Sequence, residues 1–241
     1  MLTVFVQYYV PKNPARAAEL NECFKKNIEN PLITTLVIFF EVEADMALIP
    51  DHQKIVKRFY PQRMTYGYWL RETDKLPVGK LSFLINSDMY LTESVSHLIT
   101  NRQAILDDKK FVAISRYNPE NGQLVLNKDP HWTQDVWGVA KGKESFPPAL
   151  YQEAAFELGQ PACDNKIAYV MFSYGFNVTN PCYKVTTVHL QADDNTRSYD
   201  PKVSKLIGLQ AYIYPSESVV DNSALDFDLL TRSKTDIKIC E

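Results

Sequence analysis

Short, almost continuous apolar runs recur through the first 115 residues, and each stops at a polar or charged side chain. Runs of about four to eight β-branched and aromatic residues are typical of strands buried on both faces. We expect strands at residues 4–10, 36–40, 64–70, 81–85 and 111–115. We expect helices between several of them, at residues 14–20, 51–59 and 93–106. This alternation predicts an α/β fold with a mixed, mostly parallel central sheet and helices on both faces.

The pattern loosens after residue 115. Strands are expected at residues 136–140 and 184–190, with a helix at residues 164–172. A chain of 241 residues is long enough to bury one sizeable core, so we expect a single domain spanning residues 1–241.

Charge and cysteine content exclude several classes of protein. The chain has 26 Lys and Arg against 29 Asp and Glu, so it lacks the basic surplus of a nucleic-acid-binding protein. Four cysteines without a C-x-x-C pair favour a reducing compartment, and we expect a cytoplasmic protein. No apolar run approaches the ~18 residues of a membrane span, so no transmembrane segment is predicted.

Ligands of open α/β sheets bind beyond the carboxyl ends of the strands. The polar residues at these ends are therefore the first candidates for a binding site: Gln7, Glu41, Arg63, Asn86, Asp88 and Arg116.

Asn86-Ser87-Asp88 follows the buried strand at residues 81–85. Residues at i and i+2 of an extended chain point the same way, so Asn86 and Asp88 present two oxygen atoms together. Such ligands suit Mg²⁺ or Mn²⁺. A strand followed by an Asx turn has the same sequence and is the structural alternative.

Trp132 and Trp137 flank Asp135. Indole rings stack on sugar rings, and a carboxylate between them can hold a hydroxyl group. The alternative is a tryptophan pair in the core, with Asp135 as a cap.

Asp164 precedes an apolar helical segment. A carboxylate beside an acceptor hydroxyl can act as a general base there. A helix-capping aspartate is the structural alternative.

His189 ends the strand at residues 184–190. A histidine in that position can bind a metal ion, and the alternative is a buried histidine with a satisfied hydrogen bond. The chain has only eight glycines and no glycine-rich phosphate loop, so a diphosphate would have to be met by a metal ion and arginines.

The order of these segments resembles that of a known family. Asn86-Ser-Asp88, Ser115-Arg116, Gln134-Asp-Val-Trp137, Ala162-Cys-Asp-Asn-Lys-Ile-Ala168 and His189, followed by Arg197-Ser-Tyr199, occur in that order. The chain is similar in these motifs to the GT-A glycosyltransferases of bacteria and large DNA viruses, which include capsid-glycosylating enzymes of chlorella viruses. The resemblance covers residues 81–199 and fits the N-terminal strands, but it thins after residue 201.

The resemblance implies a GT-A fold, a nucleoside-diphosphate sugar donor, UDP-linked, and a glycan or glycoprotein acceptor. It implies Mn²⁺ or Mg²⁺ as cofactor, although Asn86 stands where the family motif begins with aspartate. Residues 1–115 would bind the nucleotide sugar and residues 116–200 the acceptor. Residues 201–241 would form a C-terminal tail that leads to a further domain if the chain is part of a longer enzyme.

The roles of individual residues also follow from the resemblance. Asp88 and His189 would bind the metal ion. Asp164 would be the base, with Asp135 as the second candidate. Trp132, Gln134 and Trp137 would line the acceptor site. The donor site would comprise Gln7, Tyr8, Glu41, Arg63, Tyr66, Asn86, Ser87, Asp88 and Arg116.

The predicted function is therefore a metal-assisted, inverting hexosyl- or deoxyhexosyltransferase. A nucleotidyltransferase is one alternative, although it usually shows a glycine-rich basic loop. The other is a non-catalytic carbohydrate-binding domain, which would bind glycans without nucleotide affinity.

Overall fold

The computed structural model describes residues 2–190 and 206–230. The Arg197-Ser-Tyr199 motif and much of the expected C-terminal tail lie outside these residues. The strands are β1 (Leu2–Tyr8), β2 (Ile33–Phe40), β3 (Ile55–Phe59), β4 (Leu81–Ile85), β5 (Met89–Leu91), β6 (Lys110–Glu120), β7 (Gln123–Leu126), β8 (Gln134–Ala140), β9 (Asn177–Thr179), β10 (Thr187–His189), β11 (Gly208–Ile213) and β12 (Leu225–Leu230). The helices are α1 (Pro14–Glu29), α2 (Tyr66–Asp74), α3 (Ser96–Thr100), α4 (Arg102–Asp107), α5 (Pro148–Glu153) and α6 (Cys163–Ser173), with 3₁₀ turns η1 (Glu43–Leu48) and η2 (Glu93–Val95).

One large sheet organises the molecule. Its strand order is β3-β2-β1-β4-β8-β6-β10-β5, and β7 and β9 also pair with β6. The first four strands in this order are parallel to one another, whereas β8 runs antiparallel to both of its neighbours. Within residues 2–190, five of the nine pairings in this sheet are parallel. The prediction of a mixed, mostly parallel sheet is confirmed.

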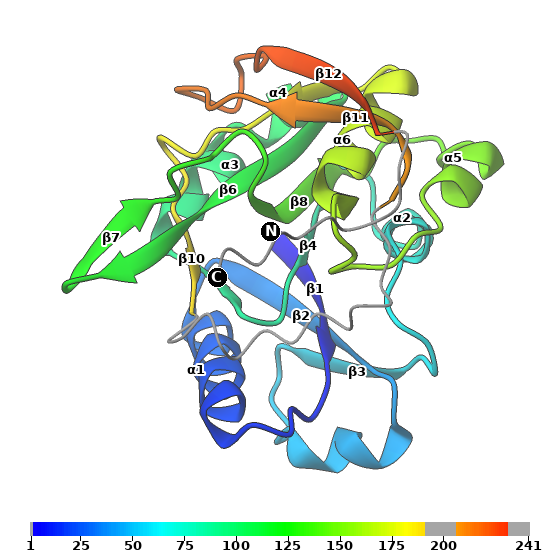
Figure 1. Cartoon of the computed structure of the whole chain (residues 1–241). Helices are drawn as coiled ribbons and strands as arrows, with labels where there is room; N and C mark the ends of the chain where they lie inside the picture. Colours follow the sequence, from blue (N-terminus) through cyan, green and yellow to red (C-terminus); the bar gives the residue numbers. More distant parts are fainter. Residues whose placement is uncertain (1, 191–205, 231–241) are drawn as a thin grey trace.

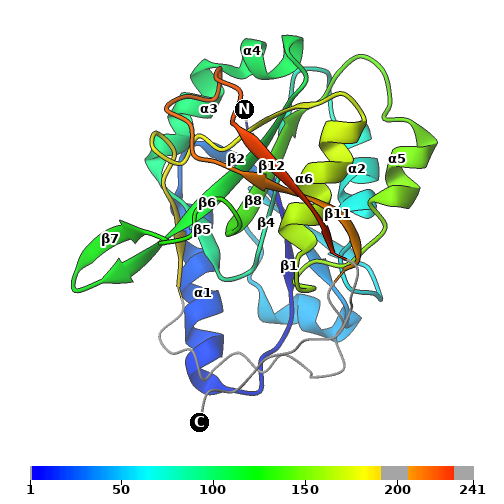
Figure 2. The ribbon, with the colours of Figure 1, turned by 45° about the horizontal axis from the view of Figure 1, so that its top comes forward.

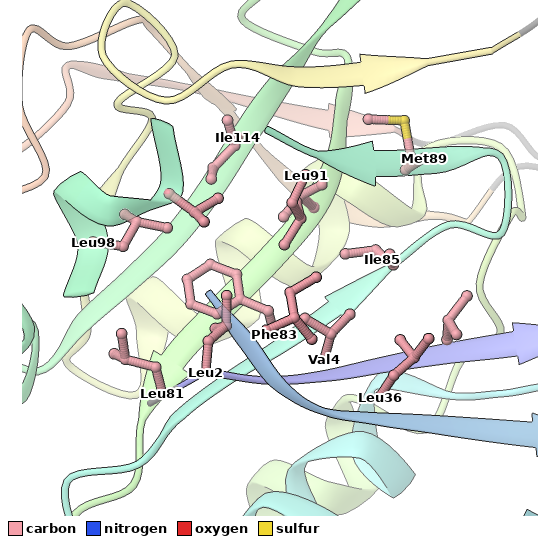
Figure 3. Close-up of a cluster of buried hydrophobic side chains, with 14 of the residues drawn as sticks. Leu2, Val4, Leu36, Leu81, Phe83, Ile85, Met89, Leu91, Leu98 and Ile114 are labelled. Carbon is pink, nitrogen blue, oxygen red and sulfur yellow. The ribbon is translucent and has the colours of Figure 1, made fainter. Parts of the chain in front are cut away.

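Helices cover both faces of the sheet (Figure 1). Because side chains alternate along a strand, Val4 and Phe5 of β1 enter two different hydrophobic cores. Val4 lies in the core beneath α1, α3 and α4, where Leu36, Phe83 and Leu98 converge (Figure 3). Phe5 lies in the opposite core, beneath α2, α5 and α6. The predicted helices on both faces are therefore also confirmed.

A two-stranded antiparallel sheet, β11–β12, crosses the outer side of α6 (Figure 2). Asn165 of α6 is buried and its Nδ2 atom donates to the carbonyl oxygen of Ala211 in β11, 3.1 Å away. The hairpin thus has a fixed position beside the first turn of α6.

Two predicted elements have the wrong type. Residues 64–70 were expected to form a strand, but Tyr66–Asp74 is helix α2. The Thr65 side chain caps this helix by accepting a hydrogen bond from the Tyr68 N–H group. The apolar residues of the helix fall on one helical face. Residues 51–59 were expected to form a helix, but Ile55–Phe59 is the edge strand β3. The predicted helix at residues 93–106 is divided into η2, α3 and α4.

Among the described helices, none has the length and apolar character needed to cross a bilayer.

Candidate functional site

A pocket lies at the carboxyl ends of the parallel strands β1, β2 and β4. Its volume is about 40 Å³, and it is open to solvent. Its lining contains five residues that the sequence assigned to the donor: Gln7, Glu41, Arg63, Asn86 and Ser87. The remaining lining residues are Tyr9, Ile85, Leu158 and Gly159. The position agrees with the rule that open α/β sheets bind ligands beyond their strand ends.

Gln7 shapes one edge of this pocket. Its buried amide donates from Nε2 to the Oε1 atom of Glu41 at 2.8 Å and accepts, through Oε1, the N–H of Met64 at 2.9 Å. Gln7, the second-to-last residue of β1, thereby connects the end of β1 with Glu41 after β2 and with Met64 in the loop before α2. Glu41 itself is exposed and keeps oxygen lone pairs for a ligand.

Arg63 supplies a positive charge at the pocket mouth. Its guanidinium is exposed, and Nε donates to the carbonyl oxygen of Leu158 at 3.0 Å. Gly159 has a φ of +74°, and a Cβ atom there would lie 2.9 Å from the Arg63 Nη2 atom. The positive φ favours glycine at this position, and a side chain there would also displace the end of the Arg63 guanidinium.

Asn86 connects the pocket with a buried carboxylate on β8. Its Nδ2 atom donates to Oδ1 of Asp135 at 2.6 Å, and its backbone N–H donates to the Asp135 carbonyl oxygen at 3.1 Å. Because β4 and β8 pair antiparallel, the end of β4 meets the beginning of β8 at this point.

Asp135 also pairs with Arg116 at the bend of β6. The Arg116 Nη1 atom donates to Oδ2 of Asp135 at 2.8 Å, and the carboxylate charge raises the pKa of Arg116. The Arg116 Nε atom is buried and has no hydrogen-bond partner in residues 2–190 and 206–230. One donor of this guanidinium is therefore left unpaired among these residues.

Asp164 lies in the first turn of α6, close enough to Asp135 for their charges to interact. Burial and the negative charge of Asp135 raise the pKa of Asp164 to about 7, against the opposing effect of nearby backbone N–H groups and of Arg116. The N-cap residue of this helix is Ala162, and Asp164 stands two positions after it, where its carboxylate interacts with backbone N–H groups of the first turn. A carboxylate with a pKa near neutrality suits general-base chemistry.

Asp88 has its hydrogen-bond partners elsewhere, in Arg16 and His189. Its buried Oδ2 atom accepts from Nη2 of Arg16 at 2.5 Å and lies 3.1 Å from Nε2 of His189. Burial alone would raise the pKa of Asp88, but the hydrogen bond and charge of His189 and the guanidinium of Arg16 hold it well below its usual range.

The residues proposed as metal ligands do not fit a divalent cation in this arrangement. Asp88 and His189 lie together, but the Oδ2 atom of Asp88 that His189 contacts already accepts a hydrogen bond from the guanidinium of Arg16. A cation placed there would be repelled by Arg16 at short range. In the part of the chain that the structure describes, no group of three or more His, Cys, Asp or Glu side chains is arranged to hold a metal ion.

Four other predicted site residues are packed inside the fold. Tyr8 contacts the rings of Phe24 and Phe40. Tyr66 is fully buried and its ring meets Trp137, which is also buried, edge to face. Gln134 is buried, and its Nε2 atom donates to the carbonyl oxygen of Pro130 at 2.7 Å. None of these four lines the pocket.

Sequence reasoning missed Arg16 and three rings near Trp132, namely His131, Tyr212 and Tyr214. Arg16 did offer a signal. An arginine in the first turn of a helix opposes the helix dipole, which favours acidic residues there. The two tyrosines offered none, because the segment around them alternates only weakly.

No family model and no curated protein matches this chain. Solved structures with a similar fold include the 2-C-methyl-D-erythritol 4-phosphate cytidylyltransferase of Francisella tularensis (13% identity, 81% of this chain and 97% of that one, TM-score 0.47). Others are TarS of S. aureus in complex with UDP-GlcNAc (11%, 82% and 61%, 0.47) and a mannosyltransferase of Pyrobaculum calidifontis in complex with GDP-Man and Mn²⁺ (12%, 78% and 56%, 0.49). The chain thus spans less than two thirds of the latter two. These are likenesses of fold, and they do not distinguish transfer of a sugar from transfer of a nucleotide.

Proposed function

We propose that this chain is a glycosyltransferase that moves a sugar from a nucleoside-diphosphate sugar, UDP-linked, to a hydroxyl group of a glycan acceptor, with inversion. The observation behind the proposal is the link made by Asn86. It lines the strand-end pocket and binds Asp135, which lies within electrostatic reach of Asp164. This series of contacts supports assigning the pocket and the carboxylate with a pKa near 7 to one site.

The pocket has groups for each part of a nucleotide donor. Glu41 and the backbone around Asn86 and Ser87 can bind the hydroxyl and base edges of the nucleoside. Arg63, which also lines the pocket, carries the charge that would pair with the diphosphate. The proposed donor site is therefore smaller than the sequence predicted, because Tyr8 and Tyr66 lie in the cores.

In the proposed reaction, Asp164 accepts the proton of the acceptor hydroxyl. The hydroxyl oxygen forms a bond to the anomeric carbon while the bond from that carbon to the diphosphate oxygen breaks. The electron pair of the broken bond leaves with the nucleoside diphosphate. Base catalysis of this kind is worth about 10²–10⁴ in rate. The guanidinium of Arg63, which lines the pocket, would stabilise the charge that develops on the leaving group.

The proposal assigns no step to a divalent cation. The carboxylate that the family motif offers to Mn²⁺, Asp88, is paired with Arg16 and His189. Positive charge for the diphosphate would come from arginine side chains.

Thermal unfolding with a panel of ligands tests the function. UDP and GDP, UTP and CTP, and the corresponding sugar nucleotides would each be added to the full chain. A ligand that binds the folded state raises the midpoint by mass action. We expect a nucleoside diphosphate or the corresponding sugar nucleotide to give the largest shift. We also expect the chain to hydrolyse that sugar nucleotide slowly and release the nucleoside diphosphate. A preference for a nucleoside triphosphate with release of pyrophosphate would instead identify a nucleotidyltransferase, and no shift with any nucleotide would overturn both.

A further inference from the structure

Four rings from two distant segments form an aromatic cluster beside β11. His131 and Trp132 precede β8, whereas Tyr212 and Tyr214 belong to β11 and the residues after it. We call these four residues the aromatic shelf. The ring of His131 stacks on Tyr214, with centroids 5.3 Å apart and an interplanar angle of 10°, and on Trp132 at 5.5 Å and 17°. Tyr212 meets both His131 and Trp132 at steeper angles.

The shelf is open to solvent. Trp132 is 47% exposed and Tyr214 is 39% exposed, although the other two tryptophans of the chain, Trp69 and Trp137, are at most 1% exposed. An exposed group of large rings is unusual on a protein surface and marks a place where another molecule binds. Stacked rings held by one another also form a rigid surface, so little conformational entropy is lost on binding.

Carboxylates border the rings. Tyr214 donates its hydroxyl to Oδ2 of Asp226 at 2.7 Å, and the carboxylate of Asp228 is close enough to raise the pKa of Tyr212. Both aspartates are exposed and lie on β12, where Asp226 is paired with Tyr212 in the hairpin register. Exposed carboxylates accept hydrogen bonds from hydroxyl groups, and aromatic faces pack on the C–H faces of a sugar ring. The combination is suited to an uncharged polyhydroxylated ring.

The shelf lies next to the carboxylate pair of the proposed active site. The N–H of Ile213 donates to the carbonyl oxygen of His131 at 2.8 Å, which joins β11 to the segment leading into Asp135. The negative charge of Asp164 is also among the causes that raise the pKa of Tyr212. A ring bound on the shelf would therefore have neighbouring sugar units close to Asp164.

We propose that the aromatic shelf, with Asp226 and Asp228, binds a pyranose ring of the acceptor glycan beside the unit that receives the new sugar. The assignment of this ring to an acceptor rests on the proposed glycosyl transfer, but the binding of a sugar ring does not. The acceptor surface thus extends from Trp132 onto the β11–β12 hairpin and excludes the buried Trp137.

Tryptophan fluorescence tests the shelf directly. Because Trp132 is the exposed member of the three tryptophans, acrylamide quenching of the chain reports mainly on it. The probes are methyl β-D-glucopyranoside, methyl α-D-mannopyranoside, methyl α-L-rhamnopyranoside and N-acetyl-D-glucosamine. We expect at least one to give a saturable change in emission and to protect against acrylamide, with a millimolar dissociation constant because one ring offers few contact atoms.

Variants separate this inference from the proposed function. Tyr214→Ala keeps the reporter and should weaken sugar binding at least about tenfold, the factor that roughly 1.4 kcal/mol gives. Tyr174→Ala removes a similar tyrosine–carboxylate pair, with Glu153, at the far end of α6 and should leave sugar binding unchanged. Nucleotide-induced stabilisation should be the same in both variants.

If no sugar gives a saturable signal, or if Tyr174→Ala weakens binding as much as Tyr214→Ala, the shelf is not a sugar site. Sugar binding without any nucleotide binding would retain the shelf and overturn the proposed transfer reaction.

Discussion

The Nη2 atom of Arg16 lies 2.5 Å from the Oδ2 atom of Asp88, and this contact joins residues 72 positions apart in the chain. Arg16 is in the first turn of α1, and Asp88 is in the turn between β4 and β5. His189, at the end of β10, contacts the same oxygen. One buried carboxylate therefore holds three elements together at the edge of the sheet.

Arg16→Ala should destabilise the fold strongly. The substitution leaves Asp88 buried beside His189 alone, and breaking a buried ion pair by removing one partner costs about 3–5 kcal/mol. Urea unfolding followed by circular dichroism measures the loss. Lys26→Ala is the control, because it removes an exposed pair with Glu22, for which we expect about 0–1 kcal/mol. Equal losses in the two variants would show that the Arg16 pair contributes no more than a surface contact.

The same pair predicts how stability depends on acid. The folded-state pKa of Asp88 is lowered, so its contribution is present above the unfolded-state value of about 3.9 and is lost as the pH falls below it. Asp88→Asn should be less stable at pH 7 but lose less free energy of unfolding between pH 4 and lower values. Denaturant titrations across this range test the slope, and parallel curves for the two proteins would contradict the assignment.

Nucleotide binding should not depend on a divalent cation. The Asp88 carboxylate, to which Mn²⁺ would bind, is already paired with the guanidinium of Arg16. Nucleotide-induced stabilisation should therefore be the same with EDTA and with Mn²⁺. Thermal unfolding with UDP and GDP under both conditions makes the comparison. A shift that EDTA abolishes and Mn²⁺ restores would mean that Asp88 exchanges Arg16 for a metal ion when nucleotide binds.

The strand-end pocket could be predicted from sequence because it depends on a general rule. Gln7 is the second-to-last residue of β1, and Glu41 and Asn86 follow β2 and β4. The carboxyl ends of these parallel strands meet at one edge. The partner of Arg16 could not be predicted, because no local pattern specifies a contact across 72 residues. Tyr66 was assigned to a strand because aromatic residues favour strands, whereas the Thr65 cap and packing beneath α5 select a helix. Strands β11 and β12 were not predicted, because a short surface hairpin has little periodicity.

Arg63→Ala should weaken nucleotide binding with little effect on stability. The guanidinium is exposed at the pocket mouth, and loss of a charged hydrogen bond to phosphate costs about 1.5–3 kcal/mol, or roughly ten- to a hundredfold in affinity. Isothermal titration with the nucleotide selected by the panel measures the change. Arg58→Ala is the matched control, since Arg58 is equally exposed on β3 but does not line the pocket. An unchanged affinity in Arg63→Ala would remove Arg63 from the donor site.

Asp164→Asn should abolish sugar transfer, leave nucleotide affinity nearly unchanged and stabilise the fold at neutral and alkaline pH. The carboxyl has a pKa of about 7 in the folded protein, above its unfolded value of about 3.9, so the unfolded chain loses the proton first and stability falls as the pH rises between these values. Asparagine cannot ionise, and the variant should escape this loss, most fully above pH 7.

Transfer by the unsubstituted chain should rise with pH and level off above about 7, since only the carboxylate accepts a proton. Unfolding curves and transfer rates measured over the same pH series test both effects. If Asp164→Asn retains transfer and Asp135→Asn loses it, the base is Asp135. If Asp164→Asn is less stable than the unsubstituted chain at pH 8, the Asp164 carboxylate is favourably paired rather than costly to ionise.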